Sequence, residues 1–338
     1  MKGKVLIYTR DYFVRVMNGM ALGLFASLII GLILKQLGTL FKIDMLINFG
    51  QVAQYSMGGA IGAGVAYILK ASPLGIFSSM ICGFLGSGSI VFDGTTAILK
   101  IGEPVGAMIA SLIGAEISKF VENKTPVNVI VIPISTIIVG GLVGIKLAPA
   151  ISEFMKWIGN IINLATTLEP FYMGIIVSVL MGIFLTLPIS SAAIAISLGL
   201  NGLAAGASTI GCSVHMVAFA ITSYRENKMS GLFSLGLGTS MLQMPNIIKN
   251  PKIFLPPIIT SAILGPIGTV IFKIENNSVG AGMGTSGLVG QIMAIETMGK
   301  DKTIIIILMT IILPGVISLI ISEFFRRKGI IKYGDMKI

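Results

Sequence analysis

The chain has 338 residues, of which 54% are hydrophobic and 11% charged, and 24 Lys and Arg against 14 Asp and Glu give a net charge of +10. A soluble globular domain carries about 25% charged residues, so this composition excludes a soluble enzyme or binding domain. Apolar runs of roughly twenty residues recur along the chain, each long enough to cross a hydrocarbon core of roughly 30 Å. The sequence therefore predicts an all-α integral membrane protein with a single polytopic domain over residues 1–338.

The basic residues fall mostly in short loops and tails, where they orient the chain and contact anionic lipid headgroups. The sequence has no run that interleaves basic and aromatic residues, so no nucleic-acid partner is expected. Cys82 and Cys212 lie inside apolar segments without the spacing of metal ligands, which indicates packing residues. Neither a metal nor a cofactor is predicted, and no intrinsic catalytic site is evident.

Residues 14–34 form the first apolar run, which follows Lys2, Lys4, Arg10 and Arg15. The run is longer than the roughly 7–15 residues of a signal-peptide core, and no small-residue cleavage pattern follows it closely, so it is interpreted as an uncleaved span. A second basic group follows the last apolar run: Arg326, Arg327, Lys328, Lys332 and Lys337. Basic flanks stay in the cytoplasm, so both termini are expected there, with an even number of crossings.

Ten membrane segments are predicted in chain order: 14–34, 45–69, 72–92, 102–120, 127–147, 170–190, 192–221, 231–248, 254–274 and 303–325. Gly and Ser interrupt the third, seventh and eighth, so the count lies between eight and ten. Residues 278–298 are expected to form a re-entrant Gly-rich hairpin. Residues 148–167 show helical apolar spacing beside Trp157, which predicts an amphipathic helix in the membrane interface or, alternatively, a tilted end of the fifth span.

Glycine is clustered in three places. The stretch "MGGAIGAGVAYI" from Met57 has the small-residue spacing that lets membrane helices pack closely. Residues 198–215 and 275–297 combine glycine with Ser, Thr, Asn and at least one titratable side chain. Broken helices at membrane depth are tolerated where they are buried in protein or line a wet cavity, and they commonly form transporter sites. These two clusters are predicted to build a substrate site; the alternative is that they are loops outside the membrane.

Polar residues at membrane depth mark candidate contacts for a solute. Asp93, Glu103 and Glu169 lie near predicted segment ends, and Glu116 is one turn from Lys119 and is expected to form an ion pair. The residues that remain are His215, Glu296, Asn201, Gln243, Asn246 and Gln291, together with Thr285 and Ser286 of the second glycine-rich cluster. A lone buried histidine can also be a hydrogen-bonded structural residue.

This residue set suits a neutral, polyhydroxylated solute. Sugars and polyols carry hydroxyls that donate and accept hydrogen bonds, and carboxylate, imidazole and amide groups match them. Apart from Arg15 at the start of the first, the predicted spans contain no arginine, which argues against a strongly anionic solute unless helix N-termini compensate.

The C-terminal half, roughly residues 170–300, resembles the EIIC-type membrane proteins of the bacterial sugar phosphotransferase system. The motifs are "LEPFYMGIIVSVLMGIFLTLPISSAAIAISLGLNGLAAGASTIGCSVH", "SLGLGTSMLQMPNIIKNP" and "GAGMGTSGLVGQIMAIE". The resemblance is greatest to the branch that includes the perfringolysin O regulator. It implies a dimer in the bacterial plasma membrane, with His215 and Glu296 as the histidine and hairpin glutamate that contact the sugar.

Two departures from the family pattern bear on these roles. The Gly before and Pro after the family's glutamate are not found at "MAIETMG", and Glu103-Pro104 and Glu169-Pro170 are rival candidates. The chain also has no EIIA or EIIB domain, so phosphorylation would need a separate EIIB-type phosphocarrier. Without one, the protein could be a facilitator, an ion-coupled transporter or a membrane-bound solute sensor.

An internal repeat is the last expectation. At an offset of 124 residues, Pro133, Gly141 and Gly144 align with Pro257, Gly265 and Gly268. The half-repeats would cover about 14–147 and 170–325 and would be inverted in the membrane.

Overall fold

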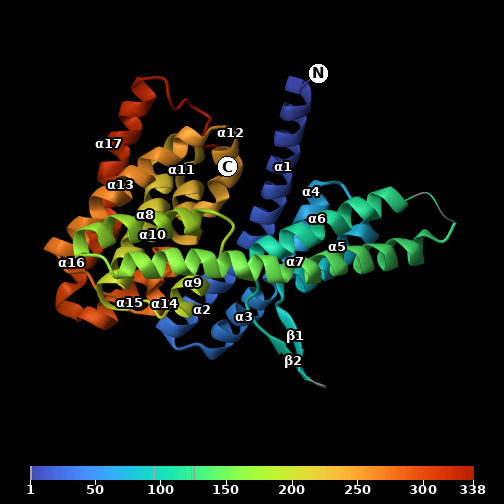
Figure 1. Cartoon of the computed structure of the whole chain (residues 1–338), viewed down its shortest axis with the longest axis horizontal. Helices are drawn as coiled ribbons and strands as arrows, with labels where there is room; N and C mark the ends of the chain where they lie inside the picture. The colour runs from blue at the N-terminus through green and yellow to red at the C-terminus, as the bar shows by residue number, and fades with distance from the viewer. Residues whose placement is uncertain (1, 94–95, 123, 125) are drawn as a thin grey trace. The chain divides into compact units, whose positions relative to one another are not determined.

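The computed structural model describes residues 2–93, 96–122, 124 and 126–338, and it is built almost entirely from helices (Figure 1). The chain divides into two compact units, residues 1–154 and 155–338. The described part of the first unit contains α1 (Lys2–Leu24), α2 (Ile30–Phe41), α3 (Asp44–Tyr55), α4 (Met57–Ile68), α5 (Pro73–Ser87), β1 (Ile90–Asp93), β2 (Thr96–Leu99), α6 (Pro104–Val121) and the start of α7 (Asn128–Thr166).

The second unit follows the end of α7. Its helices are α8 (Pro170–Thr186), α9 (Ser191–Ser197), α10 (Gly202–Thr222), α11 (Tyr224–Phe233), α12 (Met244–Lys249), α13 (Leu255–Pro266), α14 (Ser278–Ala281), α15 (Val289–Met298), α16 (Thr303–Ile307) and α17 (Leu313–Arg327). Short π-helical turns at Phe25–Ile29, Ser234–Gly238, Ile267–Ile271 and Leu308–Ile312 interrupt or end longer helices.

The helices confirm an all-α membrane protein. Within the described residues, six helical stretches are long and apolar enough to cross a membrane: Asp11–Thr39, Pro104–Val121, Asn128–Leu147, Gly202–Thr222, Pro251–Ile271 and Lys300–Arg327. Three shorter apolar helices, α4, α5 and α8, add to them. The number of crossings stays a prediction, because length and hydropathy alone do not place a helix across the bilayer.

Four predicted segments differ from the structure. Residues 45–69 form two helices that meet at Ser56. Residues 72–92 are not one helix, because Gly88, at φ +64°, ends α5 and the chain enters the antiparallel β1–β2 hairpin. Residues 192–221 are interrupted at 198–201, between α9 and α10. Residues 231–248 are not one continuous helix either, since the π-helical turn Ser234–Gly238 leads through extended Thr239 into a short 3₁₀ helix and α12.

Residues 148–166 are helical and belong to α7, which runs on from the predicted fifth span without a break.

Glycine packing in the first unit follows the prediction for the Met57 stretch. A Cβ on Gly64 would collide with the carbonyl oxygen of Gly19 in α1, and one on Gly62 would collide with that of Ser79 in α5. Because α4 carries glycine at both contacts, its backbone lies directly against two neighbouring helices.

In the second unit α10 is the central helix, and nearly all of its residues are buried. It packs against α8, α13 and α17 (Figure 1). The approach is closest at Gly211, where a Cβ would collide with the Ser178 carbonyl of α8, and at Gly206, where it would collide with the Ile274 carbonyl. Helix α10, which carries His215, therefore packs directly against the backbone of α8 on one side and the backbone at Ile274 on another.

Candidate functional site

The first glycine-rich cluster breaks at its beginning and is helical afterwards. Gly199 and Gly202 both have φ +59°, and the chain between α9 and α10 turns there. Asn201 is exposed in this turn, and its Nδ2 donates to the Gly199 carbonyl oxygen at 2.6 Å. From Gly202 to Thr222 the cluster is continuous helix, so the predicted break is confirmed only for residues 198–201.

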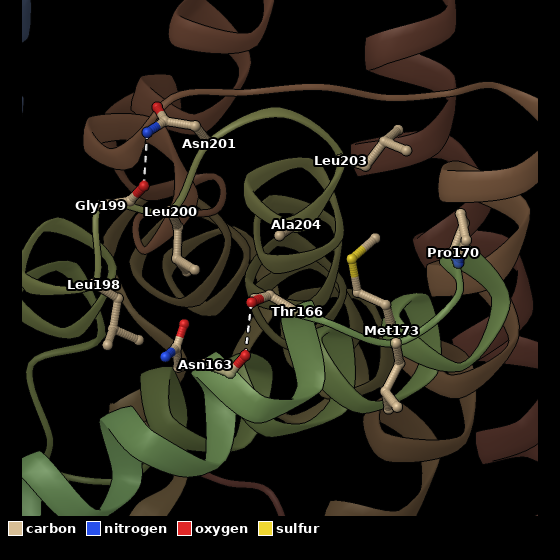
Figure 2. Close-up of a pocket in the computed structure, with 11 residues that line it drawn as sticks. Asn163, Thr166, Pro170, Met173, Leu198, Gly199, Leu200, Asn201, Leu203 and Ala204 are labelled. Atoms are coloured by element: carbon tan, nitrogen blue, oxygen red, sulfur yellow. Dashed lines mark hydrogen bonds between the residues drawn. The ribbon is translucent and has the colours of Figure 1, made fainter.

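A cavity of about 470 Å³ opens at this turn (Figure 2). The start of α8 at Pro170, the start of α10 and the end of α7 at Asn163 and Thr166 line it. Asn201 belongs to this cavity. His215 lies fourteen residues further along the chain, almost all of them helical, which at 1.5 Å per residue corresponds to about 20 Å. The structure therefore does not bring Asn201 and His215 into one site.

His215 belongs to a buried hydrogen-bond network at the end of α8. The side chain is fully buried, and Nδ1 lies 3.0 Å from Thr186 Oγ1. Thr186 Oγ1 also lies 2.8 Å from Ser240 Oγ and 3.0 Å from the Gly182 carbonyl oxygen. Three segments that are distant in sequence thus meet at one hydroxyl.

The single proton of the Thr186 hydroxyl links the state of the imidazole to the direction of these hydrogen bonds. When Thr186 donates to the Gly182 carbonyl, His215 Nδ1 donates to Thr186 Oγ1, and a neutral imidazole then has its lone pair on Nε2. When Thr186 donates to Nδ1 instead, Nε2 carries the proton. Nε2 is buried and has no hydrogen-bond partner among the described residues.

The groups around the imidazole ring of His215 are small or apolar. A Cβ on Gly182 would lie 2.7 Å from His215 Nε2, so only glycine leaves room for the ring at this position of α8. The Phe254 ring meets the imidazole edge to face, with centroids 5.3 Å apart and an interplanar angle of 83°. The sequence prediction did not include the neighbours of His215, which are Thr186, Ser240, Gly182 and Phe254. Thr186 alone had a sequence signal, because its hydroxyl lies two residues before Pro188 near the end of a predicted span.

The second glycine-rich cluster folds as a helix–turn–helix of α14 and α15 that packs on α10. Ser208 Oγ donates to the Ala281 carbonyl at 2.5 Å, and Asn276 Nδ2 donates to Thr209 Oγ1 at 2.7 Å. Gln291 Nε2 donates to Ser213 Oγ at 3.2 Å, while Gln291 Oε1 is buried without a partner. Residues two apart on a helix point to different sides, so Gln291 lies at the level of His215 but around the helix from it.

Thr285 and Ser286 support the segment that presents Ser240. The Thr285 hydroxyl donates to the Gly236 carbonyl, and the Ser286 hydroxyl donates to the Gly238 carbonyl at 2.8 Å. Both acceptors belong to the π-helical turn directly before Ser240. These two predicted residues therefore lie in the neighbourhood of the site and position one of its members.

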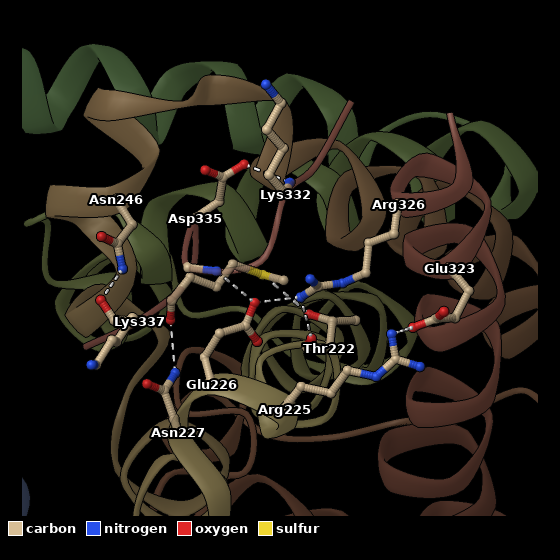
Figure 3. Close-up of polar contacts among 12 residues, drawn as sticks. Thr222, Arg225, Glu226, Asn227, Asn246, Glu323, Arg326, Lys332, Asp335 and Lys337 are labelled. Carbon is tan, nitrogen blue, oxygen red and sulfur yellow. Dashed lines mark hydrogen bonds and ion pairs between the residues drawn. The ribbon is translucent and has the colours of Figure 1, made fainter. Parts of the chain in front are cut away.

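The amides of Gln243 and Asn246 are hydrogen-bonded to other residues of the chain and do not point into an open site. Gln243 Nε2 donates to the Met336 carbonyl at 2.8 Å, and Asn246 Nδ2 donates to Gln243 Oε1 and to the Lys337 carbonyl at 2.9 Å each (Asn246 and Lys337 in Figure 3). Both amides hold the segment that follows α17.

Glu296 is not part of the network around His215. It is exposed on α15 and makes no hydrogen bond or ion pair within the described part of the chain. Of the rival carboxylates, Glu103 precedes α6 in the first unit and is half-buried, and Glu169 is exposed at the start of α8. The sugar-contact role of Glu296 stays a prediction, and its expected partner His215 is paired with Thr186.

Comparison of the sequence with known proteins finds one protein family that matches it. Residues 14–338 match the family described as "Phosphotransferase system, EIIC". No curated protein and no solved structure shows significant similarity to the chain. The match covers almost the whole chain, including every residue of the His215 network.

Proposed function

Because the chain belongs to the EIIC family of the phosphotransferase system, we propose that it is the membrane permease for a carbohydrate whose hydroxyl is bound by His215 Nε2. The family supplies the general role, a sugar-specific membrane component that works with phosphotransferase partners. The identity of the sugar, the contact residues and the coupling to phosphorylation belong to the proposal.

The observation that carries the proposal is His215 Nε2, which is buried without a hydrogen-bond partner among the described residues and, with the ring proton on Nδ1, offers a lone pair. A buried acceptor without a donor costs about 1–3 kcal/mol, so its position is explained if a ligand provides the donor. A sugar hydroxyl donates to such an acceptor and can accept from a neighbouring hydroxyl, as Ser240 and Thr186 offer. An ionised carboxylate has no proton to give, which disfavours a carboxylate as the group bound at Nε2.

The proposed setting follows the sequence prediction. The protein works in the bacterial plasma membrane as a homodimer with both termini in the cytoplasm. A separate EIIB-type protein phosphorylates the sugar, because neither buried cysteine, Cys82 or Cys212, is placed to accept a phosphoryl group.

Substitution of His215 tests the proposal, with uptake of radiolabelled sugars and polyols into proteoliposomes that contain a phosphorylated EIIB-type protein as the measurement. In His215→Asn the amide occupies the position of Nδ1 and keeps the bond to Thr186, but Nε2 is lost. We expect folded protein with uptake reduced at least about tenfold, the equivalent of roughly 1.4 kcal/mol. His215→Gln places its amide near Nε2 and should retain more uptake than the Asn variant.

Cys212→Ala is the matched control, because Cys212 is buried one turn earlier on α10 and lies outside the network. Uptake by His215→Asn equal to that of the control would contradict the role of Nε2. Saturable binding without uptake in the native protein would favour a solute sensor, and saturable uptake without any phosphocarrier would favour a facilitator or an ion-coupled transporter. Glu296→Gln, measured in parallel, tests the remaining predicted contact.

A further inference from the structure

Four amide side chains of the second unit form a groove that is filled by the chain's own residues 335–338. They are Asn227 on α11, Gln243 on the 3₁₀ helix Ser240–Gln243, Asn246 on α12 and Asn250 just after α12. Gln243 and Asn246 are buried, although each is a side chain that would be satisfied by water at a surface. We call these four residues the amide groove; Asn227 and Asn246 are labelled in Figure 3.

The amide groove binds main-chain groups of the segment in it. Asn227 Nδ2 and Gln243 Nε2 both donate to the Met336 carbonyl oxygen, at 2.7 and 2.8 Å. Asn246 Nδ2 donates to the Lys337 carbonyl, and the Ile338 amide donates to Asn227 Oδ1 at 2.9 Å. Amide side chains thus bind the main-chain groups of three consecutive residues, Met336 to Ile338.

Two side chains of the segment add anchors. Met336 is 1% exposed, and its sulfur accepts from Thr222 Oγ1 at 3.6 Å. Asp335 Oδ2 accepts from Asn250 Nδ2 at 2.7 Å, and the Gly334 amide donates to Glu226 Oε1 at 3.3 Å. Met336 therefore takes the place of a peptide's anchoring side chain in a buried pocket.

The segment is attached to the rest of the protein mainly by these side-chain contacts. Residues 328–338 form turns, with no helix or strand. Their described main-chain bonds to other main-chain groups are local, as in Asp335 N to the Lys332 carbonyl at 3.2 Å. A segment held by side-chain contacts at its end can leave without breaking regular secondary structure.

The amide groove is built on the same stretch that covers His215. At one end of this stretch Ser240 is hydrogen-bonded to the Thr186 hydroxyl, and at the other end Phe254 packs on the imidazole. Three residues of the amide groove lie between them in sequence: Gln243, Asn246 and Asn250. Residues 240–254 consist of two short 3₁₀ helices and the six-residue α12. Occupation of the groove therefore fixes the stretch that encloses Nε2.

We propose that the amide groove is a peptide-binding site whose ligand is residues 332–338 of the same chain, and that release of this ligand frees residues 240–254 and gives a solute access to His215. The access step depends on the proposed function; the peptide site does not. The ligand class is a peptide that folds into turns, with a buried methionine and an acidic residue directly before it.

Peptide binding to the full-length protein in nanodiscs tests the site. The probe is a fluorescent synthetic peptide of residues 329–338, and the variant is Met336→Asp, which removes the chain's own anchor. Tyr333→Asp is the matched control, because Tyr333 is in the same segment and 75% exposed. We expect the peptide to bind Met336→Asp at least about tenfold more tightly than the native protein or the control. Equal binding to all three proteins would overturn the proposal.

A crosslink tests the same site by holding the segment in place. Asn250→Cys and Asp335→Cys replace two side chains in direct contact, in a background of Cys82→Ala and Cys212→Ala. With a short bifunctional thiol reagent, hydrogen exchange of residues 240–254 should slow and sugar uptake should fall at least about tenfold, and reduction should restore both. Unchanged exchange overturns the peptide site, and slowed exchange with full uptake overturns the access step while the permease function stands. Absence of uptake before crosslinking overturns the proposed function, and the exchange result still decides on the site.

Discussion

At the scale of residues, the chemistry of the site depends on neutral side chains that sequence patterns do not distinguish. His215 could be selected from the sequence because it is the only histidine in an apolar stretch. Thr186 and Ser240 could not, since buried hydroxyls commonly bond to their own helix and carry no charge that marks them. Glu296 was selected for its charge, yet the helix turns it to an exposed position.

One prediction at this scale concerns the buried ion pair between α11 and α17. Arg326 Nη2 lies 2.8 Å from Glu226 Oε1, and the two side chains are 9% and 0% exposed. Glu226→Gln leaves the guanidinium buried without its counter-charge, so we expect a loss of about 3–5 kcal/mol of folding free energy, seen as a lower melting temperature in a thermal-shift assay.

The neighbouring pair provides the control for that prediction. Arg225 Nη1 and Glu323 Oε1 lie 3.1 Å apart with side chains 60% and 31% exposed, and an exposed pair contributes about 0–1 kcal/mol. Glu323→Gln should therefore change the melting temperature little. Equal losses in the two variants would contradict the assignment of Glu226 as the buried partner.

At the scale of elements, the sequence predicts where helices lie better than where they stop. Apolar runs located every long span, because burial in hydrocarbon requires about twenty apolar residues. The segment 231–248 has the same composition, but Gly236, Gly238 and Thr239 let the chain leave the helix there. Hydropathy averages over such breaks, and the hydrogen bonds from Thr285 and Ser286 that stabilise the non-helical path come from a distant segment.

Helix α10 gives the element-scale prediction. A Cβ on Gly211 would collide with the backbone of Ser178, which cannot rotate away as a side chain could. Gly211→Ala should therefore push α8 and α10 apart and reduce both folded yield and uptake severalfold. Overpacking of this kind costs about 1–3 kcal/mol or more.

Gly315→Ala on α17 is the comparison, since its Cβ would only touch Ile221 and Val217 at 3.6 Å, an ordinary contact distance. Size-exclusion profiles and uptake should match the native protein. If Gly211→Ala behaves like Gly315→Ala, the close approach of α8 and α10 is not required for the fold.

At the scale of the whole molecule, the charge distribution predicts the topology. Basic residues cluster at both ends of the chain, and such flanks stay in the cytoplasm. Lys4→Cys and Lys328→Cys, in a background of Cys82→Ala and Cys212→Ala, should react with a membrane-impermeant maleimide in inverted vesicles and not in intact cells. Ala218→Cys, which is fully buried, should remain unlabelled in both. Labelling of the two sites from opposite sides would imply an odd number of crossings.

The 124-residue offset also belongs to this scale and stays a prediction, although two contacts agree with it. In the first unit Gly58 lies against Ser87, and in the second Gly182 lies against Gly211. Both residues of the second pair follow those of the first by 124 positions. Likewise Gly144 lies against Gly86, and Gly268 lies against Ile210.

The ends of α5 and α10 differ at matching positions, and this difference has an evolutionary consequence. By the offset, Ser87 corresponds to Gly211, but α5 ends at Ser87 while α10 continues to Thr222. His215 corresponds to Val91, an exposed residue of strand β1. Under the gene duplication that the offset predicts, the two copies have diverged at this point: one ends its helix in a hairpin, and the other extends it by three turns and carries His215, the histidine of the proposed site, on the extension.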